Sequence, residues 1–171
     1  MDRRHFIGQS AAAVGLLAGF SSQTKAASLQ KAEILVIGGG YGGATAAKYL
    51  RLLSNNTARV TLIEPNTSFI SCPMSNLVIG GSRTMAEITS PYDTLSKRHG
   101  IKIIQDSVVI IDPTQKTVKL ASGKSLRYDK AVVSPGISMN MNTIEGLTQA
   151  NKAGVTLQAW KAGAETVALH K

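Results

Sequence analysis

Residues 31–66, KAEILVIGGGYGGATAAKYLRLLSNNTARVTLIEPN, decide the fold of this chain. The apolar and β-branched run AEILVI predicts a short buried strand at its start. Glycines in G-x-G-x-x-G spacing come next, followed by the helix-forming stretch ATAAKYLRLL and a second strand-like run, ARVTLIE. A strand, a glycine-rich turn, a helix and a strand in this order predict an α/β fold with a parallel sheet.

The glycines and one acidic residue of this segment predict a dinucleotide-binding site. Gly38 allows the tight turn out of the strand, Gly40 lets the backbone approach a pyrophosphate, and Gly43 lets helix and strand pack closely. The helix N-terminus offers unpaired N–H groups and the positive end of its dipole to the phosphates. Glu64 stands at the end of the second strand, where its carboxylate is expected to bind a ribose diol and to repel a 2′-phosphate.

Residues 101–136, IKIIQDSVVIIDPTQKTVKLASGKSLRYDKAVVSPG, alternate short strands with the turns DPTQ and SGKS. This pattern predicts a three-stranded β-meander inserted after the second strand–helix unit, followed by a return strand. Pro135 and Gly136 at the end of that strand are expected where backbone approaches a bound cofactor. Domains that bind only NAD normally lack such a meander. The combination therefore resembles the FAD domain of the disulfide oxidoreductase class with two dinucleotide-binding domains.

Residues 1–27 predict a twin-arginine export signal. Arg3 and Arg4 precede the apolar run AAAVGLLAGF, and small residues around Ala26 and Ala27 fit a signal peptidase site. This run is too short to span a bilayer, and it has no polar face, which argues against an amphipathic helix. We therefore expect a periplasmic protein, exported already folded, with no transmembrane segment after removal of the signal.

Composition excludes some function classes. The chain has 171 residues, a formal net charge of +9 and 43% hydrophobic residues, which is ordinary for one globular domain. Its basic residues are scattered, without a charged block and without interleaved aromatic residues. This distribution argues against nucleic-acid binding but suits an acidic protein partner or aids solubility. No metal site is predicted.

Cys72 is the only cysteine of the chain, so it cannot form an internal disulfide. The class described above often carries C-x-x-x-x-C after the ribose-binding acid, but Leu77 stands at the second position here. Three roles remain open for Cys72: a buried inert thiol, a nucleophile without an evident histidine partner, or a covalent anchor for the flavin.

The residues after Cys72 favour the anchor. Pro73 is expected to hold Cys72 extended and to begin a helix of two turns that ends at Gly80 and Gly81. Cys72 would then cap the helix N-terminus, where the dipole stabilises a thiolate. A thiolate beside the dimethylbenzene ring of a flavin can bond to its 8α-methyl carbon.

Several stretches of the chain together resemble the flavoprotein subunit of flavocytochrome c sulfide dehydrogenase. They are VIGGGYGGATAAKYLR, VTLIEPNTSFISCPMSNLVIGG, YDTLSKRHGIKIIQDSVVIID, YDKAVVSPGI and AWKAG, of which the segment with the cysteine is the most specific. The resemblance implies FAD, linked to Cys72 by an 8α-S-cysteinyl thioether. It also implies that residues 28–171 are the N-terminal part of the FAD-binding domain, truncated relative to the family.

The resemblance further implies a reaction and its partners. In that family, sulfide attacks a redox-active disulfide beside the flavin, and FAD passes the electrons singly to a cytochrome c subunit. The two cysteines of that disulfide are absent here, so no residue of this chain is assigned a catalytic role. Two alternatives stay open: a non-catalytic, truncated flavin-binding fragment, and a relative of sulfide:quinone oxidoreductase.

Two further positions carry weaker expectations. The backbone of Val108 is expected to meet the adenine, although plain packing within the meander explains the residue equally well. The stretch AWKAG, with Trp160 and Lys161, is expected to begin the crossover to a second domain. Trp160 is expected to be an anchoring core residue.

Overall fold

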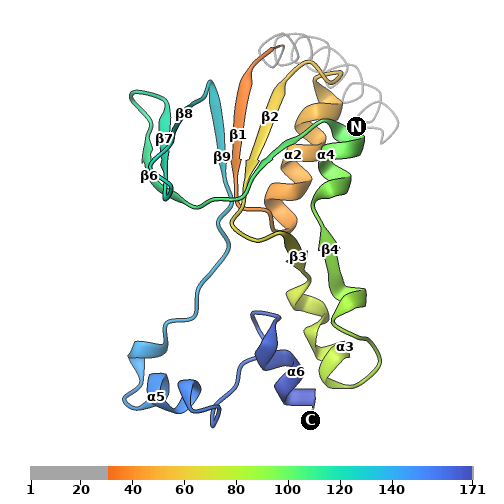
Figure 1. Cartoon of the computed structure of the whole chain (residues 1–171), viewed down its shortest axis with the longest axis vertical. Coiled ribbons are helices and arrows are strands. Elements are labelled where there is room, and N and C mark those ends of the chain that lie inside the picture. The colour runs from red at the N-terminus through yellow and green to blue at the C-terminus, as the bar shows by residue number, and fades with distance from the viewer. Residues whose placement is uncertain (1–30, 171) are drawn as a thin grey trace, which may run out of the picture.

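The computed structural model describes residues 31–170 (Figure 1). The predicted twin-arginine signal lies outside these residues. The central sheet has four parallel strands in the order β5-β2-β1-β9. Its strands are β1 (Glu33–Ile37), β2 (Arg59–Ile63), β5 (Lys102–Ile104) and β9 (Lys130–Val133). The predicted α/β fold with a parallel sheet is therefore confirmed.

The strands of this sheet are apolar on both faces because both faces are covered. Ile34 and Val36 of β1 face the side where helix α2 (Tyr41–Leu53) and helix α4 (Asp93–His99) lie (Figure 1). Leu35 and Ile37 alternate with them and pack on the opposite side, against the meander. Successive side chains of one strand thus build two separate cores.

The predicted meander is present as a three-stranded antiparallel sheet. Its strands are β6 (Val108–Asp112), β7 (Thr117–Leu120) and β8 (Ser125–Arg127), in the order β6-β7-β8. The two predicted turns join them. Asp112 accepts hydrogen bonds from backbone N–H groups of the first turn, and Gly123 in the second turn has φ of +87°. Val118 and Leu120 of β7 are buried against the central sheet.

A small antiparallel ribbon extends from the central sheet, and sequence patterns did not predict it. Strand β3 (Ser68–Ile70) pairs with β4 (Thr89–Pro91), and between them lie three short helices. They are the 3₁₀ helix η1 (Cys72–Met74), helix α3 (Ser75–Ile79) and the 3₁₀ helix η2 (Ala86–Ile88). Three-residue strands are too short to show alternation, and Pro91 argues against a strand in sequence.

The residues after β9 leave the sheet and end beside α3 (Figure 1). This part contains the 3₁₀ helix η3 (Met141–Thr143), helix α5 (Leu147–Lys152) and helix α6 (Ala164–His170). The expectation that Trp160 is a core residue is wrong within this chain, because its side chain is 62% exposed. The sequence around Trp160 could not reveal this exposure, since burial of a single aromatic residue depends on tertiary contacts.

Candidate functional site

The glycine-rich turn joins β1 to α2, and two of its glycines leave no room for a side chain. Gly38 has φ of +95°, and a Cβ there would lie 2.1 Å from the carbonyl oxygen of Ser134. A Cβ on Gly43 would lie 1.8 Å from the carbonyl oxygen of Gly38. The first glycine therefore permits contact with the end of β9, and the last permits contact between the helix and the turn.

Gly40 differs from these two, because its own protein neighbours leave space for a Cβ. Its φ is −66°, which any residue adopts, and the nearest atom to a Cβ would be Phe69 Cε2 at 3.9 Å. Gly40 caps α2 without a side-chain hydrogen bond, and the first turn of α2 holds no acidic residue. The open space and the uncapped N–H groups of this 13-residue helix fit a pyrophosphate.

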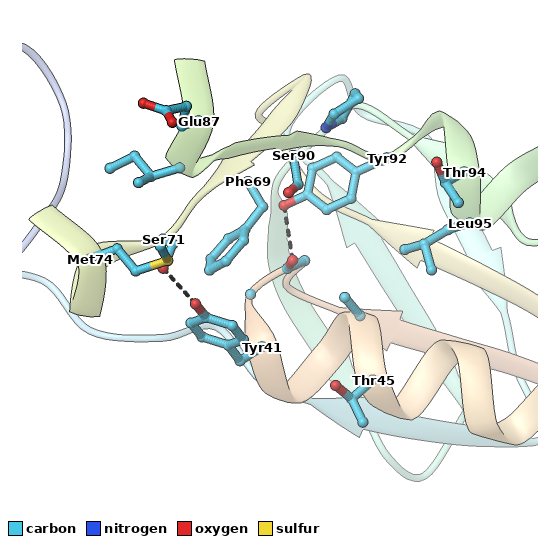
Figure 2. A pocket seen from close by; sticks show the side chains of 15 residues that line it. Tyr41, Thr45, Phe69, Ser71, Met74, Glu87, Ser90, Tyr92, Thr94 and Leu95 are labelled. Atoms are coloured by element: carbon cyan, nitrogen blue, oxygen red, sulfur yellow. Dashed lines mark hydrogen bonds between the residues drawn. The ribbon is translucent and has the colours of Figure 1, made fainter. Parts of the chain in front are cut away.

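Gly39, between Gly38 and Gly40, is held by hydrogen bonds to both its N–H and its carbonyl. Its N–H donates to Glu64 Oε2 at 2.7 Å. Its carbonyl accepts from Tyr92 Oη at 2.9 Å (Figure 2). Burial, together with the nearby charge of Glu64, raises the pKa of Tyr92 to about 12. Tyr92 therefore stays protonated near neutral pH and remains a donor to the turn.

Glu64 is only 8% exposed and lies at the end of β2, as expected for a ribose-binding acid. Its Oε1 accepts from the backbone N–H of Asn66 at 3.0 Å and from Asn66 Nδ2 at 2.6 Å. A carboxylate offers about four acceptor positions. The bonds to Gly39 and Asn66 use three, so one acceptor position is left for a hydroxyl donor.

The turn that carries Cys72 departs from the expected geometry by one residue. The 3₁₀ helix begins at Cys72 itself, and the extended residue that caps it is Ser71, with φ of −73° and ψ of 98°. The expectation that Cys72 is extended and caps the helix is therefore wrong. Pro73 lacks an N–H to donate, and a first-turn position tolerates it, so the helix begins one residue earlier. The helical stretch ends at Gly80, as predicted.

A cavity of about 490 Å³ joins the glycine turn to the cysteine turn (Figure 2). Gly39, Gly40 and Tyr41 line one side of it, and Ser71 and Met74, on either side of Cys72, line another. Its remaining walls come from α2, β3, β4 and the start of α4, including Thr45, Phe69, Ser90, Tyr92 and Leu95.

Tyr41 crosses the space between these two turns. Its hydroxyl shares a hydrogen bond with Ser71 Oγ, and its ring meets Phe69 edge-on with centroids 4.8 Å apart (Figure 2). Tyr41, Ser71 and Tyr92 were not singled out from the sequence. The residue before a cysteine and an aromatic residue inside a glycine motif carry no local signal of such contacts.

The other predicted site residues are divided between two places. Pro135 lies at the glycine turn, since its Cα is 3.1 Å from the position of a Cβ on Gly38. Gly136 has φ of +78°, and no atom lies within 4 Å of a Cβ built there. Val108 lies on the meander side of the sheet and packs against the core of that side, which fits the packing role of its side chain. The contact of its backbone with adenine stays a prediction.

The sequence profile of the family described as "Pyridine nucleotide-disulphide oxidoreductase" matches residues 32–166. The chain belongs to this family. It is 32% identical over 127 residues to the mitochondrial sulfide:quinone oxidoreductase of Dictyostelium discoideum, covering 72% of this chain and 27% of that protein. Over 46 residues it is 56% identical to the flavoprotein chain of sulfide dehydrogenase (flavocytochrome c) from Chlorobaculum thiosulfatiphilum, covering 27% of this chain and 94% of that sequence.

Solved structures confirm the Rossmann-like fold of FAD- and NAD(P)-binding proteins. The structure of sulfide:quinone oxidoreductase from Aquifex aeolicus superposes with a TM-score of 0.70 at 27% identity, covering 81% of this chain and 30% of that one. The chain thus spans under a third of this structure and of the Dictyostelium protein. Between residues 31 and 170, no helix has the length and apolar character that a membrane span requires.

Proposed function

We propose that this chain supplies the FAD-binding part of a periplasmic sulfide dehydrogenase that passes electrons to a cytochrome c. The observation that carries the proposal is the single cavity that meets both the uncapped glycine turn and the residues flanking Cys72. The 56% identity to a flavocytochrome c flavoprotein chain over 46 residues supports this choice. When bound, FAD accepts an electron pair from a substrate and releases electrons singly to a one-electron carrier.

The residues of this chain bind and orient the cofactor. The free N–H groups at the start of α2 would hold the pyrophosphate, and Gly40 keeps the approach open. Glu64 would accept a ribose hydroxyl with its remaining acceptor position. Cys72, one residue beyond the cavity wall formed by Ser71, would hold the flavin through an 8α-S-cysteinyl thioether.

Retention of flavin after denaturation tests the covalent link. We expect acid-precipitated protein to keep its yellow colour and Cys72→Ser to release FAD into the supernatant, because no other thiol is present. Ser82→Ala is a matched control, since Ser82 lies in the same segment but bonds only to the carbonyl of Leu77. Free flavin from the unmutated protein would contradict the thioether.

Electron acceptors separate this proposal from its rival. The similarity to sulfide:quinone oxidoreductases over 72% of the chain favours a quinone-reducing enzyme as the second candidate. Sulfide-dependent reduction of cytochrome c, with no reduction of a soluble quinone analogue, is the expected result for the enzyme in which this chain supplies the flavin site. Reduction of the quinone alone would favour the second candidate, and flavin binding without turnover would favour a non-catalytic flavin-binding fragment.

A further inference from the structure

The last described residues fold back onto the helix that follows Cys72. Helix α6 packs beside α3 (Figure 1). His170 Nδ1 lies 3.0 Å from the carbonyl oxygen of Ile79, at the end of α3. Thr166 on α6 is completely buried, and Gly81 lies so close to His170 that a Cβ would meet its ring at 3.1 Å. The cysteine segment is thus covered by residues that come some ninety positions later in the chain.

Ser75 connects this covering segment to the cysteine turn directly. Ser75 is 4% exposed, and its Oγ lies 2.6 Å from the carbonyl oxygen of Cys72. The same Oγ lies 2.7 Å from the carbonyl oxygen of Ala159. A hydroxyl has one proton, so Ser75 donates to two carbonyls that share it. The two carbonyls compete for this proton, so a looser contact with Ala159 leaves more of it to Cys72.

Hydrogen bonds of Glu165 and Gln158, which we call the brace, hold the loop that contains Ala159. Glu165 Oε2 accepts from the backbone N–H of Gln158 at 2.8 Å, and Glu165 Oε1 accepts from Asn151 Nδ2 at 3.1 Å. The side chain of Gln158 accepts from the backbone N–H of Lys161 at 2.8 Å. These bonds close the loop on both sides of Ala159. The hydrogen bonds from Gln158 and Asn151 also lower the pKa of Glu165, so its carboxylate stays charged at neutral pH.

We propose that Ser75 is a positioning residue for Cys72, and that the loop held by Glu165 determines how strongly Ser75 binds the cysteine turn. The inference rests on the proposed role of Cys72 as the flavin anchor. The two carbonyls are coupled through Ser75. The brace holds the Ala159 carbonyl in place, Ser75 bridges it to the Cys72 carbonyl, and the thiol is thereby kept in one position. Loss of the Ser75 hydroxyl frees the cysteine turn, whereas release of Ala159 leaves the proton to the Cys72 carbonyl and holds that turn more tightly.

The rate at which iodoacetamide alkylates the flavin-free chain measures this coupling, because Cys72 is the only thiol. Cys72 is half-buried, and a hydrogen bond that holds its turn contributes about 1 kcal/mol, so we expect Ser75→Ala to raise the rate up to about fivefold through more frequent opening of the turn. Glu165→Ala should lower it, because the Ser75 proton then goes to the Cys72 carbonyl alone. The double variant should match Ser75→Ala, which has no hydroxyl left to share. Ser75→Thr, which restores a hydroxyl, should return the rate towards that of the unmutated chain.

Two controls make the outcome decisive. Ser82→Ala removes a hydroxyl bonded only within its own segment and should leave the alkylation rate unchanged. Circular dichroism establishes that each variant is folded, and if Ser75→Ala is not, the surface variant Glu165→Ala still decides. An unchanged or faster rate in Glu165→Ala overturns the coupling, even if Ser75→Ala is faster.

The flavin assay is separate from the alkylation assay, so the two proposals can fail independently. Unmutated protein that never retains flavin after acid treatment contradicts the thioether, whereas the alkylation rates still report the coupling. Flavin retained by unmutated protein, with no alkylation response in either variant, overturns the role of Ser75 alone.

Discussion

Tyr92 and Gly39, which are 53 residues apart in the chain, are joined by a buried hydrogen bond of 2.9 Å from the phenol to the glycine carbonyl. The same peptide segment is held from the other side by Glu64. The glycine turn is therefore rigid before any ligand arrives. A site whose donors are already oriented loses less entropy on binding than one that must be ordered.

Removal of the Tyr92 hydroxyl should loosen this turn. Tyr92→Phe leaves the buried carbonyl of Gly39 without its donor, which costs about 1–3 kcal/mol in the free energy of unfolding. We expect a lower urea midpoint and weaker FAD binding, both measurable on the purified protein. Tyr49→Phe is the matched control because Tyr49 is 51% exposed. Equal losses in both variants would contradict the role of the buried bond.

The same tyrosine predicts the behaviour of the protein at alkaline pH. The pKa of Tyr92 rises from its ordinary value of 10.0 to about 12 on folding. The folded state therefore holds this proton more tightly than the unfolded state, and the associated stability is complete below pH 10. It is lost as the pH rises from 10 to 12. Urea unfolding across this range should show a steeper loss in the unmutated protein than in Tyr92→Phe; parallel curves would contradict this origin.

Gly40 and Gly43 should respond differently to one added methyl group. Gly43→Ala forces a Cβ to within 1.8 Å of the Gly38 carbonyl oxygen, so we expect a chain that does not fold stably. Gly40→Ala has space within the protein and should fold, but its methyl group occupies the approach of the pyrophosphate. We expect FAD affinity to fall about tenfold or more, a loss of at least about 1.4 kcal/mol. Calorimetric titration measures the affinity, and normal FAD binding by Gly40→Ala would place the cofactor elsewhere.

Substitution of Glu64 tests how its acceptor positions are divided. Glu64→Gln places an amide NH₂ where one oxygen accepted, opposite a donor of Gly39 or Asn66. We expect a loss of about 1–3 kcal/mol in stability and weaker, but measurable, FAD binding. Glu87→Gln is a control, since Glu87 lines the cavity but bonds to Thr84 near the surface. If Glu64→Gln has the affinity and stability of the control, the ribose contact is wrong.

The proposed export route has its own test. Arg3→Lys together with Arg4→Lys keeps the charge but removes the paired guanidinium groups. We expect the double variant to remain in the cytoplasm, as measured by fractionation of cells and immunoblotting. Unchanged periplasmic yield of the double variant would indicate a different route, whereas Lys25→Ala, which removes one charge but keeps the arginine pair, should still be exported.

Local patterns predicted the parts of the fold that depend on neighbouring residues. β1, β2 and the meander strands have runs of apolar residues between glycine or proline turns, and the structure contains them. The helix start at Cys72 was misplaced by one residue because Pro73 suits either of the first two helical positions, so it does not fix which residue caps the helix.

The contacts that hold the site together were beyond such patterns. Tyr92 reaches Gly39 across 53 residues, and Ser75 reaches Ala159 across 84. Pairings at this distance depend on where the ribbon and the final helix lie in space. No periodicity within a window of a single strand or helix contains that information.

The pairing of β1 with β9 also affects how the chain is made. Glu33 and Asp129, at the start of this pairing, are 96 residues apart and joined by a backbone-to-carboxylate hydrogen bond. At roughly 5–20 residues per second, a ribosome needs about 5–20 s to pass from one to the other. During that time, one edge of β1 has no strand beside it and can pair with a neighbouring nascent chain. An expression host that translates this interval slowly lengthens the exposure, so codon choice between the two strands should influence the yield of folded protein.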